Sequence, residues 1–362
     1  MYKRQYITAV FATLFLVGCG DGIDLPSVNV ETDLNKIPLP DNNVNLEQVE
    51  LKPSTEPMLH EGLHTEEDFQ RIRDKKAAGE EPWISAYQLL VESQFSQKTA
   101  DTYPTEWIKR GVSGDENYMN AARGVTIVYQ QALRWKIEQD DEYAAKAVEN
   151  LNKWVQTCVG VTGNTNLSLA AGLYGYEFAI AGELLRDYGG WDRADFAAFQ
   201  NWLLKVFYPA NDDFLKRHHD TNALHYWANW CLCNIAAKMA IGIVTDRRDI
   251  YNEGIAHLQT GDTNGRLRRA IYHDYAPDYN FAQWQESGRD QGHTLMCVGL
   301  MGVICQLAWS QGDDFFAYDD NLFLRACEYA ACCNYTNETV PYTTYILSLI
   351  HISEPTRLGM IS

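Results

Sequence analysis

Two stretches of the sequence, about sixty residues apart, hold most of the side chains that could perform chemistry. The first is TNALHYWANW, residues 221–230, and the second is QWQESGRDQGHT, residues 283–294. Together they contain two histidines, an arginine, a glutamate and several amides. Histidine can move a proton near neutral pH, and the guanidinium group of arginine can bind a carboxylate through two hydrogen bonds. These residue types predict a site that binds an acidic sugar and moves one proton.

The first stretch has the spacing of one helix face. Four polar residues lie three or four positions apart and would share a side of a helix: Asn222, His225, Tyr226 and Asn229. We predict that His225 is the base of a proton transfer and that the two asparagines donate hydrogen bonds to an acidic substrate. The structural alternative for His225 is a core histidine that bonds a backbone carbonyl.

The second stretch places an arginine between two other ionisable residues. Arg289 is the candidate for binding a substrate carboxylate, because its planar guanidinium group matches one. On a helix, Glu286 and His293 would share its face, and His293 could be a second proton-handling group. The structural alternative is a buried ion pair between Glu286 and Arg289, and both interpretations hold if Glu286 orients Arg289.

Aromatic and amide side chains supply further candidates. Aromatic rings offer large apolar faces on which sugars can stack, and a tyrosine can protonate a departing glycosidic oxygen. The predicted substrate contacts are Trp227, Glu286, Gln291, Tyr174, Tyr176 and Trp284. Tyr226, Tyr174 and Tyr176 are also candidates for the acid. Core packing is the alternative for each of these aromatic residues.

Composition and charge restrict the partners. The chain has 362 residues and a formal net charge of -18, and it offers no basic stripe to a phosphate backbone, which excludes nucleic acid. The same charge should repel an anionic polysaccharide at long range. A cleft that binds one would need local positive charge, which loop residues could provide: Arg217, His218, His219, Arg266, Arg268 and Arg269.

The N-terminus has the features of an export signal. Lys3 and Arg4 precede an apolar run of about a dozen residues, which is too short to span a bilayer. The run ends in Leu-Val-Gly followed by Cys19, which resembles the lipobox of bacterial lipoproteins. We predict a lipidated Cys19 and a periplasmic or outer-membrane location, with membrane contact only through the lipid anchor. An ordinary signal peptide is the alternative.

The composition then divides the chain. Residues 1–19 are predicted to be the lipoprotein signal peptide, and residues 20–57, rich in Asp, Asn and Pro, a flexible tether. Residues 58–345 form the predicted catalytic domain. Residues 346–362 break the helical pattern and are predicted to be a non-native tail, so that the natural protein continues beyond residue 345.

Helical periodicity recurs in pairs within residues 58–345. Each pair joins a helix that is apolar on most faces to a more amphipathic one, as expected for inner and outer helices. The predicted pairs are 118–138 with 143–154, 167–188 with 192–207, 222–244 with 249–258, and 293–310 with 321–333. We predict an all-α fold: an (α/α) toroid, or incomplete barrel, of repeated helical hairpins. An open α-solenoid is the alternative.

The long connections between pairs are the predicted walls of a cleft. They are residues 159–168, 208–221 and 261–283, and sites tend to lie on such loops. Besides Cys19 the chain has eight cysteines, which lack the paired spacing of a zinc site. We predict no metal and no cofactor.

In combination, these motifs resemble the alginate lyase superfamily of α/α-toroid polysaccharide lyases, especially exported members of the Bacteroidetes type. The resemblance rests on HYWANW and WQESGRDQGH, preceded by MLHEGLHTEEDFQRIR and AAGLYGYEFAIAGELLRDY, in the order of the family. The best-known sites of the family have adjacent Asn-Asn-His before Tyr-Trp. Here Ala and Leu separate Asn222 from His225, which leaves the residue that neutralises the substrate carboxylate open.

The resemblance implies cleavage of a uronate polymer, such as alginate or glucuronan, by β-elimination. Such a reaction removes the C5 proton beside a carboxylate, which needs both a base and donors that stabilise the developing anion. We expect His225 to take the proton, while Arg289 with Asn222 or Asn229 stabilises the carboxylate. A tyrosine or His293 would then protonate the leaving oxygen.

Two other classes of protein remain open at this stage. A glycoside hydrolase on an α/α barrel would need two carboxylates across the scissile bond. Glu286 and Asp290 would instead lie together on one helix face, although Asp220 or Glu177 could supply the second group. The other alternative is a non-catalytic glycan-binding surface lipoprotein.

Overall fold

The computed structural model describes residues 54–336 and 339–343. The predicted signal peptide, the lipidation site Cys19, most of the predicted tether and the predicted tail lie outside the described residues. The structure therefore bears on the predicted catalytic domain.

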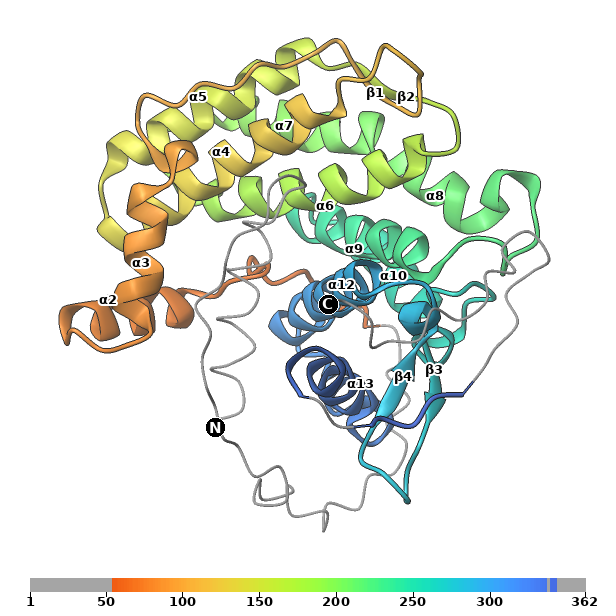
Figure 1. Ribbon diagram of the computed structural model, residues 1–362. Coiled ribbons are helices and arrows are strands. Elements are labelled where there is room, and N and C mark those ends of the chain that lie inside the picture. The colour runs from red at the N-terminus through yellow and green to blue at the C-terminus, as the bar shows by residue number, and fades with distance from the viewer. Residues whose placement is uncertain (1–53, 337–338, 344–362) are drawn as a thin grey trace.

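Four helical hairpins build the fold, as predicted from the paired periodicity. The inner helices are α4 (Tyr118–Glu138), α6 (Leu167–Leu185), α9 (Ala228–Val244) and α12 (Gln291–Ser310). The outer helix that follows each is α5 (Asp141–Thr157), α7 (Arg193–Val206), α10 (Arg248–Thr260) and α13 (Tyr318–Tyr335). Neighbouring inner helices contact each other in chain order, and Figure 1 shows the hairpins arranged in an arc. The fold is thus an all-α, incomplete (α/α) toroid.

Shorter elements complete the described chain. The additional helices are α2 (Glu66–Ala77), α3 (Trp83–Glu92), α8 (Tyr208–Arg217) and α11 (Leu267–Ala270), with 3-10 turns η2 (Gln94–Ser96), η3 (His218–Asp220) and η4 (Gln285–Gly288). Strand β1 (Trp107–Arg110) pairs in parallel with β2 (Gly160–Gly163), and β3 (Ile271–Asp274) pairs antiparallel with β4 (Ala282–Trp284).

Small residues let neighbouring helices approach closely, both between inner helices and within a hairpin. A Cβ added to Gly172 of α6 would lie 2.4 Å from the sulfur of Cys233 on α9, and one added to Gly242 would lie 2.6 Å from the backbone nitrogen of Tyr251 on α10. Almost every side chain of α6 and α9 is buried. Helix α12 is long and apolar enough to cross a membrane, but its position as an inner helix explains that composition equally well.

The first helix of the domain begins with a capping box. The Thr65 hydroxyl accepts a hydrogen bond from the Asp68 backbone at 3.2 Å, and the Asp68 carboxylate accepts one from the Thr65 backbone at 3.0 Å. Three acidic residues then occupy the first turn. This reciprocal capping box, with its favourable helix-dipole interaction, fixes the start of α2.

All four inner helices begin at the same end of the arc, which we call the mouth. Their N-cap residues are Asn117, Asn166, Trp227 and Asp290. The three predicted cleft walls each connect an outer helix to the next inner one, so they also lie at the mouth. They contain β2, then α8 with η3, and then α11 with β3 and β4, which Figure 1 shows on the right of the molecule.

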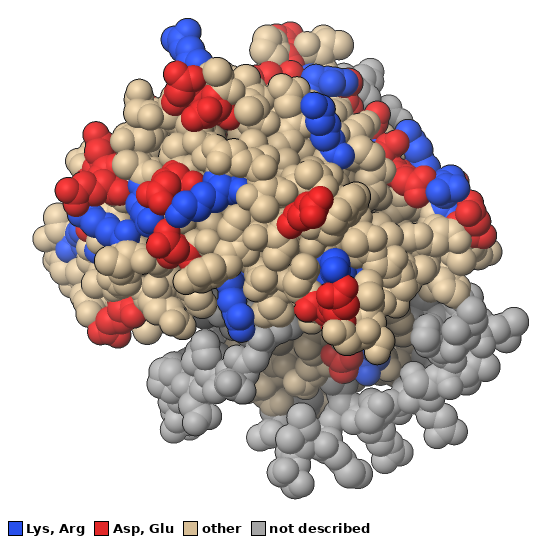
Figure 2. All heavy atoms as spheres, turned by 90° about the horizontal axis from the view of Figure 1, so that it is seen from above, with Lys and Arg blue, Asp and Glu red and all other residues tan. Residues whose placement is uncertain are grey.

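The surface charges are mostly mixed. Figure 2 shows basic and acidic side chains side by side over the face seen from above. Many form ion pairs, such as Lys146 with Asp101 at 2.7 Å and Lys153 with Glu149 at 2.7 Å. Exposed pairs of this kind contribute little to stability, and they leave no broad field of one sign on the face in view.

Candidate functional site

The two chemistry-bearing stretches meet at the mouth. The backbone nitrogen of Ala228 donates to the Gln285 side-chain oxygen at 3.0 Å, and that of Asn229 donates to Glu286 at 2.8 Å. Residues 221–230 are thus joined to residues 283–294 through the first turn of α9 and the turn η4.

The prediction that the polar residues of the first stretch share one helix face is wrong. Helix α9 begins at Ala228 rather than at Asn222, because Trp227 has an extended backbone, with φ -61° and ψ 157°. The Asn222 side chain accepts a hydrogen bond from the Leu224 backbone at 2.8 Å, and its carbonyl accepts one from the His225 backbone at 2.9 Å. Such local bonds compete with helix formation, so Asn222, His225 and Tyr226 lie on a turn before the helix.

The second stretch is also not one helix. Glu286 lies in the turn η4, while Asp290 is extended and caps α12 by accepting a hydrogen bond from the His293 backbone at 2.8 Å. Glu286, Arg289 and His293 therefore do not share a helix face. They are brought together by the sharp change of direction before α12.

Glu286 is a buried anchor. Its side chain is fully buried, and its two oxygens accept hydrogen bonds from the Asn229 backbone at 2.8 Å, the Asn229 amide at 3.1 Å and the Cys297 thiol at 3.3 Å. Burial raises the pKa of Glu286, and these hydrogen bonds and the charge of Arg289 oppose that rise. The carboxylate also lies at the start of α9, where a negative charge complements the helix dipole.

Arg289 is held on two sides yet remains accessible. Its Nη1 donates to the Glu286 carboxylate at 3.2 Å, and its guanidinium carbon lies 5.2 Å from the centre of the Trp227 ring. The Arg289 side chain is 30% exposed. The ion pair and the cation–π contact fix the guanidinium group while part of it faces solvent.

His293 is paired with the capping carboxylate. Its Nδ1 lies 2.6 Å from Asp290 Oδ2, and its side chain is 37% exposed. Burial would raise the pKa of Asp290, but the hydrogen bonds and charge of His293 lower it overall. This contact favours a proton on Nδ1, which leaves Nε2 as an acceptor in the neutral ring. Gln291, the first residue of α12, is half-buried beside it.

His225 and Tyr226 adjoin an aromatic cluster. The ring of the half-buried His225 lies 4.9 Å from that of Tyr226, which also contacts Phe214 at 5.1 Å and Trp230 at 4.7 Å. Tyr226 is 8% exposed, and burial raises its pKa. Tyr226 therefore keeps its proton at neutral pH.

His219 was not predicted as a site residue, only as a source of positive charge. Its Nε2 lies 3.0 Å from the Ser168 hydroxyl at the start of α6, and its ring lies 5.7 Å from that of Tyr226. Burial lowers the pKa of His219. The sequence signal for His219 was the pair of adjacent histidines, His218 and His219, in a wall loop. The contact of His219 with α6 is tertiary, so this pair alone did not predict it.

Besides Glu286 and Tyr226, four of the predicted site residues are buried in this structure. Trp284 is fully buried and donates to the Ala326 carbonyl at 2.9 Å. Tyr174 and Tyr176 are 5% and 7% exposed within the core of the ring. The Asn229 amide is buried and donates to Glu286. The three aromatic residues take part in the packing between the layers of helices, as in the structural alternative, and Asn229 positions Glu286.

Two of the four wall-loop arginines, Arg217 and Arg268, are paired with carboxylates, which weakens the prediction of a positive cleft built from these residues. Arg217 pairs with Asp213 at 2.6 Å and with Asp220 at 3.3 Å. Arg268 pairs with Asp319, and Arg269 donates to the carbonyl of Asp262. Asp213 and Asp220 lie in the same wall loop as Arg217, whereas Asp319 reaches Arg268 from α13.

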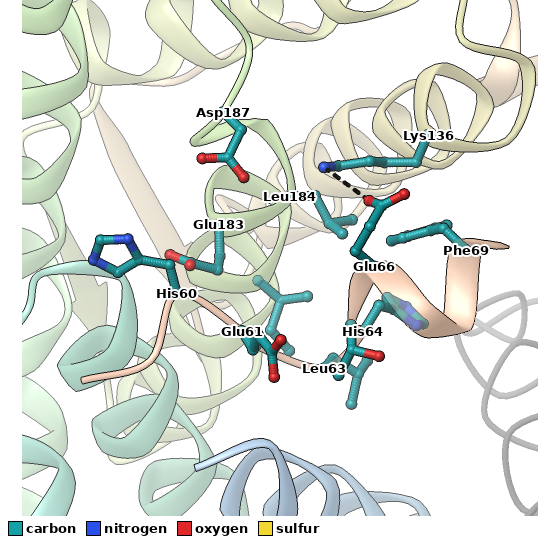
Figure 3. Close-up of a pocket in the computed structure, with 13 residues that line it drawn as sticks. His60, Glu61, Leu63, His64, Glu66, Phe69, Lys136, Glu183, Leu184 and Asp187 are labelled. Atoms are coloured by element: carbon teal, nitrogen blue, oxygen red, sulfur yellow. Dashed lines mark ion pairs between the residues drawn. The ribbon is translucent and has the colours of Figure 1, made fainter. Parts of the chain in front are cut away.

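A separate pocket of about 200 Å³ lies at the opposite end of the inner helices. Figure 3 shows it between the N-terminal segment around His60 and the ends of α4 and α6, with Glu61, Glu183 and Asp187 among its lining residues. Such an acidic lining would repel a polyuronate. Within residues 54–336 and 339–343, no group of three or more His, Cys, Asp or Glu side chains could hold a metal ion.

Comparison with known proteins places this architecture. The alginate lyase family model matches residues 73–338. A comparison with curated proteins gives no match. Among solved structures, a histidine variant of alginate lyase A1-III complexed with a tetrasaccharide is 13% identical, with a TM-score of 0.60, covering 78% of this chain and 82% of that one.

Two further structures share the fold. Alginate lyase A1-III from Sphingomonas species A1 is 14% identical, with a TM-score of 0.54, covering 76% of this chain and 80% of that one. An alginate lyase from Bacteroides ovatus is 14% identical, with a TM-score of 0.53, covering 74% and 82%. The family model spans most of the chain, from α2 to the end of α13. The chain therefore belongs to the alginate lyase family and is a polysaccharide lyase.

Proposed function

We propose that this lyase cleaves a polyuronate of the alginate or glucuronan type by β-elimination at the mouth. The observation that carries the proposal is Arg289, which is anchored by Glu286 and Trp227 but still partly exposed. A fixed guanidinium group at an accessible position suits a carboxylate that must be held and stabilised.

The reaction needs stabilisation of the anion that forms when the C5 proton leaves. Arg289 would bind the C5 carboxylate and stabilise it as negative charge accumulates there. Asn222 is exposed and lies on the turn before α9, so its amide nitrogen is the proposed second donor. Of the two asparagines, Asn222 is favoured because the Asn229 amide already donates to the buried Glu286.

His225 is the proposed base. Its ring is half-buried at the mouth and contacts Tyr226 at 4.9 Å. A neutral imidazole can accept the C5 proton at neutral pH. Its place on a turn, and not inside a helix, lets the ring face a bound polymer.

Two groups are suited to protonate the leaving oxygen. The raised pKa of Tyr226 keeps its hydroxyl protonated at neutral pH. His293 is oriented by Asp290 and is the second candidate. Variants Tyr226→Phe and His293→Gln distinguish them, because loss of the acid should lower kcat more than it raises KM.

The hydrolase alternative has less support. Glu286 would have to donate a proton across a scissile bond. Both of its oxygens are instead occupied by Asn229, Arg289 and Cys297, and the side chain is fully buried. A carboxyl group in that position cannot contact a glycosidic oxygen without breaking these bonds.

The test is to incubate the protein with alginate, polymannuronate, polyguluronate, glucuronan and neutral glucans, and to follow the ultraviolet absorbance of a C4–C5 unsaturated uronate. A rise with one of the polyuronates supports elimination and identifies the substrate. New reducing ends without that absorbance would establish hydrolysis instead. No product from a folded protein would favour glycan binding without catalysis.

The variant His225→Gln tests the assignment of the base. We expect turnover to fall by about a hundredfold or more, which is the usual contribution of general acid–base catalysis. The melting temperature should hardly change, because the half-buried His225 side chain forms no hydrogen bond or ion pair with any described residue and makes its ring contact with Tyr226. His273 of strand β3, whose ring also makes an edge-on contact with a tyrosine, Tyr275, provides a matched control in His273→Gln. Full activity in His225→Gln would refute the assignment.

A further inference from the structure

Arg110 is a cation at the mouth without an acidic partner. It is the last residue of β1, and it forms no ion pair with any carboxylate among the described residues. The Arg110 side chain is half-buried, and its Nη1 is buried without a hydrogen-bond partner. Buried donors are nearly always satisfied in proteins, so an unsatisfied guanidinium nitrogen indicates a group that awaits an acceptor.

Strand β1 fixes the direction of this side chain. Successive residues of a strand point to opposite faces, and Ile108, two residues before Arg110, is fully buried. Arg110 therefore points inward, whereas Lys109 points outward and pairs with Asp115 at 2.6 Å. Opposite Arg110 stands Gly163, where an added Cβ would lie 1.8 Å from the Arg110 carbonyl oxygen. The close approach of β2 thus requires glycine.

An aromatic ring supports the guanidinium group from the side of α4. The guanidinium carbon lies 4.7 Å from the centre of the Tyr118 ring, in the first turn of that helix. Stacking of this kind holds an arginine in place and leaves its edge available for hydrogen bonds. The arrangement repeats the one at Arg289, whose guanidinium group lies over Trp227.

The inward direction brings Arg110 toward the inner helices that carry the proposed site. Strand β1 contacts both α4 and α6. The charge of Arg110 also acts on the Cys233 thiol of α9, where it lowers a pKa that burial raises. Cys233 in turn acts on Cys297, the thiol that donates to Glu286. Arg110 therefore faces the inner helices whose first turns lie at the mouth.

We propose that Arg110 binds a second carboxylate of the polyuronate, on a sugar other than the one whose C5 proton is removed. This rests on the proposed function, since it takes the polymer bound by Arg289 as the ligand. A uronate chain carries one carboxylate on every sugar, so two separated arginines can hold two sugars of one chain. Arg110 would then select for charged polymers and place the chain in register with His225.

The experiment measures binding and turnover separately. Dissociation constants for a polyuronate oligosaccharide are measured by calorimetry with His225→Gln, and again with Arg110→Met added to it. Steady-state kinetics compare the native chain with Arg110→Met, Arg110→Lys and the control Lys109→Met, which removes a like charge from the other face of the same strand. Melting temperatures show whether each variant folds.

We expect Arg110→Met to raise both the dissociation constant and KM by about tenfold or more, as for a lost charge-assisted hydrogen bond. The change in kcat should stay within about twofold, since the contact is equal in the ground and transition states. Arg110→Lys should lie between, because lysine keeps the charge and loses the bidentate geometry. Lys109→Met should match the native protein.

Methyl-esterified oligosaccharide supplies the chemical control. Because the ester has no carboxylate charge, its dissociation constant should be the same with and without the Arg110→Met substitution. An unchanged dissociation constant in a folded Arg110→Met variant would overturn the proposal, and so would a difference that persists with the ester. Failure of the native protein to cleave any polyuronate would instead refute the proposed function, and the calorimetry would still decide whether Arg110 binds the chain.

Discussion

Separate removal of each partner of the Glu286–Arg289 pair, and then of both, distinguishes a structural role from a catalytic one. In Arg289→Met, the fully buried Glu286 loses its cation but keeps hydrogen bonds from Asn229 and Cys297. In the double variant Glu286→Gln with Arg289→Met, the charge is gone from both positions. The glutamine oxygen can still accept from the Asn229 backbone.

The expected magnitudes follow from burial. Breaking a fully buried ion pair costs about 3–5 kcal/mol. Arg289 is 30% exposed and three donors to Glu286 remain, so we expect Arg289→Met to lose about 2 kcal/mol at pH 8. The double variant should recover about 1 kcal/mol of this, since contacting residues typically couple by about 0.5–3 kcal/mol.

The loss in Arg289→Met should depend on pH. Burial raises the pKa of Glu286 in the native protein, and removal of the positive charge of Arg289 should raise it further. An acid with a raised pKa in the folded state costs stability as pH rises through the interval from its unfolded to its folded pKa. The penalty should therefore be small near pH 5 and larger at pH 8.

Urea unfolding at both pH values and the unsaturated-uronate assay together test this reasoning. Stability should be partly restored in the double variant, whereas turnover should stay reduced by about a hundredfold or more in both variants, because the stabilising donor is absent from each. Recovery of turnover in the double variant would show that Arg289 acts only in the fold. A penalty equal at pH 5 and pH 8 would refute the electrostatic account of Glu286.

Two further predictions concern stability away from the mouth. Burial raises the pKa of Glu177 on α6 to about 8, so ionisation should cost stability as pH rises from about 4.5 to about 8. At pH 8, Glu177→Gln should therefore have a free energy of unfolding about 2 kcal/mol higher than that of the native protein, a value reduced from the full pKa shift because solvent reaches part of the side chain. At pH 4 the two proteins should have the same free energy of unfolding. Thr65→Ala removes the cap of α2 and should cost about 1 kcal/mol, whereas Thr65→Ser should cost less, with turnover unchanged in both. Equal effects of both substitutions would contradict the capping argument.

The hairpin architecture was predictable because its cause is local. Apolar residues at helical spacing and breaks such as Gln139-Asp140-Asp141 determine where helices lie, and α4 has the predicted bounds. The start of α9 was not predictable in the same way. Asn222 binds the backbone of Leu224 and forms a turn, which favours a non-helical backbone although the residue spacing still matches a helix.

The side-chain environments depended on contacts that the local sequence does not contain. The burial of Trp284 and Tyr176 could not be read from residue type, because aromatic side chains serve both in cores and in sugar binding. Arg110 was overlooked because its inward direction depends on the pairing of β1 with β2, about fifty residues later. Conversely, the ion pair between Glu286 and Arg289, which was the structural alternative, is present, and the two residues lie only three positions apart in the sequence.

The distribution of paired charge bears on the proposal that so acidic a chain binds a polyanion. Many of its basic residues already have acidic partners, among them Lys146, Lys153 and Arg217. At the mouth the balance differs, because Arg110 has no carboxylate partner among the described residues, and the carboxylates near Arg289 also cap α9 and α12. Ionic screening limits the repulsion from the rest of the surface to about 8 Å at physiological salt. Within that distance, the proposed binding of a polyuronate depends on the unpaired guanidinium group and the helix N-termini more than on the net charge of the whole molecule.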